Sequence, residues 1–183
     1  MLAQSIHPAI ALTRDVIGLI IPAGTPFPLK SGMLVQITQA LGSSFTVFCE
    51  GHLVRLYGRD ADALGLPEPV VELHSDLAMP LTEQHVMKTL RGIYDPEIPV
   101  NIVDLGLIYD CRIEPLESNQ LKIWIVMTLT APACGMGPIL AGDVEYLCKQ
   151  LPNVADVHVD VVFDPPWTHE QMTQAAKLTL GLI

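Results

Sequence analysis

Residues 107–130, LIYDCRIEPLESNQLKIWIVMTLT, decide the fold of the second half of this chain. Residues 107–114 alternate between two faces, and apolar residues occupy every second position of residues 121–129. A polar turn, LESN, separates the two runs. Alternation with a period of two is typical of a strand that buries one face. The stretch therefore predicts two strands joined by a turn, each with one apolar face.

Helical patterns flank these strands. The segment before them has a candidate N-cap at Thr82 and a buried apolar stripe, which Pro96 ends. The segments after them predict a second helix, a valine-rich strand and a third helix, over about residues 138–151, 154–164 and 168–180. The resulting order, α-β-β-α-β-α, predicts a two-layer α/β sandwich.

The first third of the chain has a different pattern. Short β signals alternate with Pro/Gly turns, and a hairpin is expected about Glu50-Gly51. Residues 65–80, GLPEPVVELHSDLAMP, hold three prolines and several acids, which is typical of an extended linker. We therefore expect an α+β chain with a small β module and linker over residues 1–78 and an α/β domain over residues 79–183.

Composition narrows the classes of function. Of 183 residues, 50% are hydrophobic and 16% are charged, which is enough apolar material for a folded core. The formal net charge of −10 argues against binding to the phosphate backbone of nucleic acids. No apolar run is long enough to span a bilayer, and the N-terminus lacks the positive start of a secretory signal. We expect a cytoplasmic protein that binds neither membranes nor nucleic acids.

The four cysteines form no CxxC pair and no zinc-ribbon spacing, so a closed metal site built from one chain is not indicated. Three of them have structural interpretations. Cys148 shares the apolar stripe of its helix, Cys111 shares the apolar face of a strand, and Cys49 lies at the end of a hairpin, a position that permits exposure.

Cys134 is different, because in LTAPACGMGP, residues 129–138, it lies where a strand stops and a helix starts. The free backbone N–H groups and the dipole of a helix N-terminus lower the pKa of a nearby thiol. Thiolate is the form that ligates iron or attacks an electrophile. The alternative is an inert loop cysteine, and the residues alone leave both interpretations open.

A loop between the first helix and the first strand is crowded with acids, namely Asp95, Glu97 and Asp104. Acids in loops are ordinarily solvated or hydrogen-bond a turn, and that interpretation is favoured for each of them. The functional alternative is that one of them approaches the cysteine turn and positions a metal or takes a proton. The six histidines show no HxH or HExxH spacing, and nucleotide-binding loops and hydrolase signatures are missing.

Three separated motifs, DPEIPVNIVDLGLIYD, MTLTAPACGMGP and VVFDPPWT, resemble the PaaD-like domain of metal–sulfur cluster biosynthesis, which occurs in iron–sulfur cluster maturation proteins. This resemblance covers about residues 81–180. The preceding segments IPAGTPFPLKSGMLVQITQALGSSFTV and GRDADALG are similar to the N-terminal part of the SufT-like accessory proteins of the bacterial Suf system.

The resemblance implies a non-enzymatic maturation factor, which carries an iron–sulfur cluster or iron transiently and delivers it to recipient apoproteins. Its partners would be these recipients and the cluster-assembly proteins. The positions that the family emphasises fall here on Asp95, Glu97, Asp104, Thr130 and Cys134, of which Cys134 would be the metal ligand. Many relatives carry proline directly after the cysteine, whereas this chain has Gly135.

One plausible thiolate cannot hold a stable cluster, because such clusters are held by several cysteine ligands. We therefore expect transient transfer, with a site shared between two subunits of a homodimer as one arrangement. Two other functions stay open. One is a thiol enzyme with Cys134 as its nucleophile, which lacks an obvious histidine base, and the other is a non-catalytic adaptor.

Overall fold

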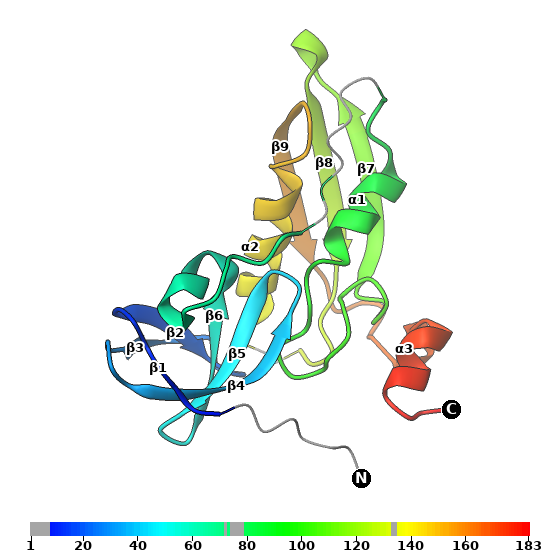
Figure 1. Cartoon of the computed structure of the whole chain (residues 1–183). Helices are drawn as coiled ribbons and strands as arrows, with labels where there is room; N and C mark the ends of the chain where they lie inside the picture. Colours follow the sequence, from blue (N-terminus) through cyan, green and yellow to red (C-terminus); the bar gives the residue numbers. More distant parts are fainter. Residues whose placement is uncertain (1–7, 72, 74–78, 133–134) are drawn as a thin grey trace.

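The computed structural model describes residues 8–71, 73, 79–132 and 135–183, and it has a separate sheet in each half of the chain (Figure 1). The N-terminal sheet has the strand order β1-β4-β5-β6-β2-β3. We call this half the β domain. Its elements are β1 (Ile10–Ala11), β2 (Val16–Ile20), β3 (Thr25–Leu29), β4 (Leu34–Leu41), β5 (Ser44–Cys49), β6 (His52–Tyr57) and the 3-10 helix η1 (Gly58–Leu64).

The tight turn between β5 and β6 confirms the predicted hairpin. Glu50 and Gly51 both have positive φ, 50° and 85°, which is the backbone that a two-residue hairpin turn needs. The hairpin position of Cys49 permits exposure, but the structure buries it, in agreement with its structural interpretation. Cys49 is only 2% exposed, and its thiol donates to the carbonyl of Leu34 at 3.6 Å. The side chain points into the core because the strand carries it to the inner face.

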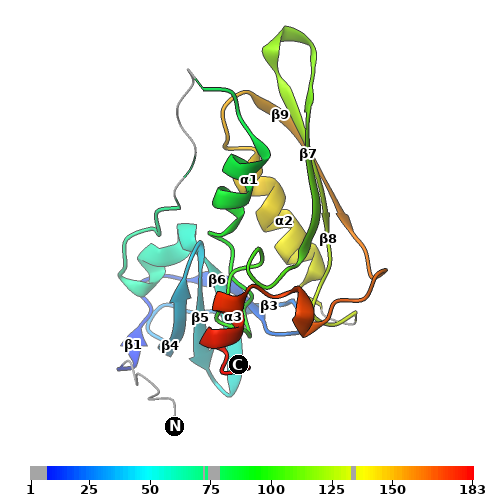
Figure 2. The same ribbon diagram turned by 90° about the vertical axis from the view of Figure 1, so that its right-hand side faces the viewer.

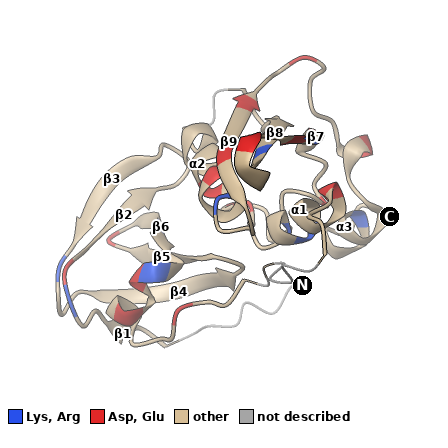
Figure 3. Cartoon of the chain, turned by 90° about the horizontal axis from the view of Figure 1, so that it is seen from above, with Lys and Arg blue, Asp and Glu red and all other residues tan. Residues whose placement is uncertain are grey.

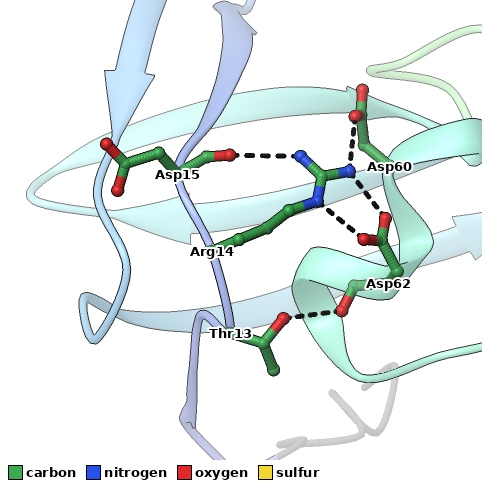
Figure 4. A network of polar contacts seen from close by, with 5 residues as sticks. All are labelled: Thr13, Arg14, Asp15, Asp60 and Asp62. Atoms are coloured by element: carbon green, nitrogen blue, oxygen red, sulfur yellow. Dashed lines mark hydrogen bonds and ion pairs between the residues drawn. The ribbon is translucent and has the colours of Figure 1, made fainter.

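A surface ion network fastens the segment after β1 to η1 (Figure 4). Arg14 donates from Nε and Nη2 to the two carboxylate oxygens of Asp62, both at 2.6 Å, and from Nη2 to Asp60 at 2.9 Å. The guanidinium lowers the pKa of Asp62 below its ordinary value. Exposed ion pairs of this kind contribute little to the free energy of unfolding. The main effect of the network is therefore to orient η1 relative to the segment after β1.

The C-terminal half, which we call the α/β domain, has a sheet with the order β7-β8-β9. Strand β7 is antiparallel to β8, and β9 is parallel to it, so α2 provides the crossover that a parallel pair requires. The elements are α1 (Glu83–Leu90), β7 (Ile108–Pro115), η2 (Glu117–Asn119), β8 (Leu121–Met127), α2 (Gly137–Cys148), β9 (Val154–Val161), η3 (His169–Gln171) and α3 (Gln174–Thr179).

Helices α1 and α2 cover one face of this sheet, and α3 lies near its end (Figures 1 and 2). The expected α+β class and the order α-β-β-α-β-α are therefore confirmed. Helix α1 starts as predicted, because Thr82 caps it by accepting from the amide of His85. It ends at Leu90, earlier than Pro96 requires, and Gly92 follows in a turn.

The two halves have separate hydrophobic cores. One core gathers residues from Leu12 to Leu64, and the other gathers residues from Val86 to Ala176. In the linker, Val71 and Leu73 pack against the second core. The boundary between residues 78 and 79 stays a prediction, because residues 74–78 lie outside the described residues.

Charged residues are interspersed over both domains, and Lys and Arg are scattered among them (Figure 3). Among the described residues, no helix is both long enough and apolar enough to cross a membrane.

Candidate functional site

The acidic loop, residues 92–107, connects α1 to β7 and is closed by its own backbone. The amide of Ile102 donates to the carbonyl of Ile93 at 2.9 Å, and the amide of Asp95 donates to that of Val100 at 3.2 Å. Tyr94 and Asn101 form an antiparallel bridge. The loop is therefore an ordered part of the fold.

Asp95 organises the first turn of this loop. It is only 6% exposed, and its Oδ1 accepts the amides of Glu97 and Ile98, each at 2.9 Å. Burial raises the pKa of Asp95, and the two amides oppose that rise. The carboxylate of Asp95 therefore accepts hydrogen bonds that hold the turn, which is the ordinary role of an acid in a loop.

Asn101 organises the second turn, although it is not among the residues predicted from the sequence. Its Oδ1 accepts the amides of Val103 and Asp104 at 3.1 and 2.9 Å, and its Nδ2 donates to Oδ2 of Asp104 at 2.6 Å. The other oxygen of Asp104 lies 3.6 Å from Nε of Arg91. The signal that would have found Asn101 is the preference of asparagine for bonding backbone amides two residues ahead.

Glu97 differs from the other two acids. Its side chain is exposed, and its carboxylate has no hydrogen bond or ion pair to any residue that the structure describes. Of the three predicted acids, it is the one whose carboxylate is free to meet a ligand or partner.

The segment after β8 lies beside the end of the acidic loop. The amide of Thr128 donates to the carbonyl of Leu107 at 2.8 Å. Thr130 follows in a bend and is half-buried. Cys134 lies outside the described residues, so the structure does not test its predicted role. The described chain resumes at Gly135, and α2 begins at Gly137, in agreement with the predicted helix start.

These observations place Leu107 and Thr128 side by side. The acidic loop and the segment after β8 therefore meet at the same end of the sheet. No hydrogen bond joins Thr130 to an acid within the part of the chain that the structure describes. In that part there is also no group of three or more His, Cys, Asp or Glu side chains placed to hold a metal ion.

The three described cysteines have the electrostatics of structural residues. Burial raises the pKa of Cys111 to about 12 and that of Cys148 to about 12, and it also raises the pKa of Cys49. Their thiols are protonated at neutral pH, and a protonated thiol is a weak nucleophile and a weak ligand. The structural interpretation of Cys111 and Cys148 agrees with this burial.

A cavity of about 410 Å³ lies between the β domain, the linker and α2. Its walls include Tyr57, Arg59, Val71 and Asp143. None of the described site residues lines it, so it is separate from the acidic loop.

Comparison with known proteins adds to this geometry. Residues 83–161 match the family described as iron-sulfur cluster assembly protein. A "Fe-S protein maturation auxiliary factor" of Porphyromonas gingivalis is 37% identical over 102 residues, which are 56% of this chain and 93% of the relative. This chain belongs to the iron–sulfur cluster assembly protein family.

Two further proteins are similar to this chain. The "Fe-S protein maturation auxiliary factor SufT" of Staphylococcus aureus is 34% identical over 90 residues, which are 49% of this chain and 98% of that protein. The crystal structure of a DUF59 domain from Bacillus anthracis is 36% identical, covers 55% of this chain and 92% of its own, and has a TM-score of 0.48.

The lengths of the relatives show which part of this chain they share. Because 102 aligned residues make up 93% of the Porphyromonas protein and 90 make up 98% of the Staphylococcus protein, neither is long enough to hold a counterpart of both domains. The resemblance to SufT-like proteins is thus confirmed through the family, while the likeness stated for the β domain stays a prediction.

Proposed function

We propose that this chain is an auxiliary factor in the maturation of iron–sulfur proteins, which transiently carries or delivers cluster or iron to recipient apoproteins through Cys134. The observation that carries the proposal is the 37% identity over 102 residues to a protein named as such a factor. The chain's role is delivery, and its partners are recipient and cluster-assembly proteins.

The arrangement of the α/β domain supports this function. Helix α2 begins three residues after Cys134 in the chain, and its first turn contains no acidic residue that would offset the helix dipole. A helix N-terminus favours thiolate in its vicinity. The exposed Glu97 supplies a free carboxylate on the acidic loop, and the other cysteines are held protonated by burial.

The number of available thiols favours transfer over storage. Cys134 is the one cysteine without a structural interpretation, and a cluster needs several protein ligands. Cargo would therefore be shared with a second subunit or with the recipient, and both arrangements leave ligands that exchange readily. Glu97, Asp104 and Thr130 are proposed to assist at this site, while Asp95 shapes the loop that presents Glu97.

The test is anaerobic reconstitution with iron and sulfide, followed by visible absorbance, iron and sulfide content, and native mass. Wild type is compared with Cys134→Ser and with Cys111→Ser, a control that removes a half-buried thiol. The proposal expects absorbance that Cys134→Ser loses and Cys111→Ser keeps. A native mass of two chains per cluster would identify the shared site.

The competing functions give other results. A thiol enzyme would show rapid alkylation of Cys134 at neutral pH but no iron-dependent absorbance. An adaptor would show neither, and Cys134→Ser would leave cellular iron–sulfur enzyme activities intact. Either pattern would overturn delivery through Cys134.

A further inference from the structure

The β domain contacts the start of the acidic loop through the turn between β4 and β5. The amide of Ser43 donates to the carbonyl of Gly92 at 2.9 Å. Gly42, in the same turn, has φ +61°, and a Cβ there would lie 2.0 Å from the same carbonyl oxygen. Glycine is therefore required at position 42 both by its backbone conformation and by the close approach of the loop.

The same strand also reaches the interior of the loop. Nε2 of Gln39, on β4, donates to the carbonyl of Asp95 at 3.2 Å. Asp95 is the residue whose carboxylate shapes the first turn of the loop. One strand and its turn thus hold the acidic loop at two points, Gly92 and Asp95.

A second turn of the β domain, between β2 and β3, contacts the segment that leads into α2. A Cβ on Gly24, which has φ +70°, would lie 2.6 Å from the carbonyl oxygen of Gly135. Conversely, a Cβ on Gly135 would lie 2.2 Å from the carbonyl oxygen of Ala23. The two backbones are packed so closely that neither has room for a side chain. Gly135 directly follows Cys134 in the chain.

These contacts are made outside the core of the α/β domain. Among the described residues, all members of that core come from Val86 onward, and the partly buried residues from before Leu81 that pack against it are Val71 and Leu73 of the linker. The β domain thus adds little to the hydrophobic core of its neighbour. It contacts instead the two segments that carry the candidate site residues, and it does so through backbone atoms, glycines and the side chain of Gln39.

We propose that the β domain is a positioning element of the candidate site. Its β4–β5 turn sets the place of the acidic loop, and its β2–β3 turn sets the place of Gly135 and hence of the start of α2. This inference deepens the proposed function, because it rests on these two segments being the delivery site. The contacts between the β domain and these two segments can be tested without bound iron or cluster.

The first test uses matched glycine variants of the full chain. Gly135→Ala introduces a clash with Ala23, whereas Gly142→Ala, in α2, introduces a Cβ with no atom within 4 Å, and neither glycine has a left-handed φ. Gly42→Ala clashes with Gly92, whereas Gly51→Ala carries the same left-handed strain in open space. Each pair therefore separates contact with the α/β domain from the effect of the methyl group itself.

The readout that needs no cargo is amide hydrogen exchange. In Gly42→Ala, peptides that cover Ser43 and residues 92–104 should exchange about tenfold faster than in Gly51→Ala, since a lost local contact lowers the opening free energy of that segment. In Gly135→Ala, peptides that cover residues 21–24 and 135–140 should do the same relative to Gly142→Ala. Equal exchange within each pair would overturn the proposal.

The readout with cargo is the rate of iron delivery from reconstituted protein to an apo-ferredoxin. Gly135→Ala and Gly42→Ala should retain bound iron but deliver it about tenfold more slowly than their controls, as expected when a site is held out of its productive geometry. If wild type binds no iron, the proposed function fails. The exchange comparison still shows whether the β domain holds the acidic loop and the start of α2 in place. Delivery at control rates from both clashing variants would overturn the positioning role.

Gln39→Ala provides a milder variant should the clashing glycine variants fail to fold. It removes one side-chain donor to the carbonyl of Asp95 and leaves every backbone contact in place. Faster exchange confined to residues 92–104, with unchanged circular dichroism, is the expected result. Exchange identical to wild type would contradict the contact through Gln39.

Discussion

Arg55 on β6 and Asp143 on α2 form a buried ion pair between the two domains, although 88 residues separate them in the chain. Their side chains are 2% and 11% exposed. The guanidinium also lies 4.8 Å from the ring centroid of Tyr57. Burial raises the pKa of Asp143 to about 6 even though Arg55 opposes the rise. Ionisation of Asp143 at neutral pH therefore costs free energy, and Arg55 reduces that cost.

Replacing Arg55 alone should make this cost visible. Arg55→Met is expected to lower the free energy of unfolding by about 3 kcal/mol at pH 7.5, because it leaves Asp143 buried without its partner. Without Arg55 the pKa of Asp143 rises further, so below about pH 6 the carboxyl is neutral in both proteins. The difference between variant and wild type should therefore grow as the pH rises through about 6.

Urea unfolding at a series of pH values measures this difference. The double variant Arg55→Met/Asp143→Leu should recover most of the stability, because it buries no unpaired charge. Arg112→Met, which removes an exposed partner of Asp110, serves as the control and should cost much less. A loss for Arg55→Met that does not depend on pH would show that the cation acts through packing alone.

Asp95 gives a second dependence on pH. Because burial raises its pKa, the folded state binds the proton more tightly than the unfolded chain does. The stability that this group contributes therefore falls as the pH rises above its ordinary value of 3.8. Asp95→Asn keeps an oxygen that accepts the amides of Glu97 and Ile98 and cannot ionise. Relative to wild type, it should become more stable as the pH rises from 3.8.

Asp95→Ala separates the hydrogen bonds from the charge. It removes the acceptor of two part-buried hydrogen bonds, so we expect a loss of about 1–2 kcal/mol in the free energy of unfolding. Thermal and urea unfolding of the two variants, followed by circular dichroism, measure both effects. If Asp95→Asn were as unstable as Asp95→Ala at every pH, the turn would not depend on the accepted amides.

Asn101 should prove as important to the acidic loop as the acids themselves. Asn101→Ala removes two accepted bonds and one donated bond, and a loss of about 2 kcal/mol is expected. Asn101→Asp keeps the acceptors but places a carboxylate where the amide donated to Asp104. Its loss should therefore shrink when the pH is lowered far enough to protonate carboxylates, since the like charges then disappear. The loss for Asn101→Ala should not shrink in this way.

Alkylation of the native protein at pH 8 should distinguish the cysteines. Cys111 and Cys148, with pKa values of about 12, hold almost no thiolate at that pH. Iodoacetamide should therefore modify Cys134 first, and the other cysteines should react mainly after unfolding in urea. Peptide mapping by mass spectrometry identifies the modified residue. Native modification of Cys111 at the rate of Cys134 would contradict the proposed thiolate at position 134.

The secondary structure of the α/β domain could be predicted from short stretches of sequence. The alternation before and after the LESN turn, the cap at Thr82 and the proline in the first turn of α2 all act within one element, so their effect is visible in local order. The third helix was predicted as one piece, but it is divided into η3 and α3. The amide of Thr173 between them donates to the carbonyl of Asp104, a contact that no local pattern reveals.

The role of each acid could not be predicted in the same way. Asp95, Glu97 and Asp104 look equivalent in the sequence, yet the first is buried in a turn, the second is exposed, and the third is held by Asn101 and Arg91. Burial depends on what packs above the loop, and that comes from distant parts of the chain. The hairpin position of Cys49 left its exposure open for the same reason, because the core that covers it is built from several strands.

The sequence by itself thus determined the order of helices and strands, the family and the residues that are candidates for iron–sulfur chemistry, since these follow from local periodicity and from motifs. Only the tertiary structure decided how the two domains meet. Gly24 against Gly135, Gly42 against Gly92 and Arg55 against Asp143 join residues far apart in the chain. A glycine that is required by a distant carbonyl looks, in the sequence, like any other turn residue, because the close approach exists only after both domains have folded.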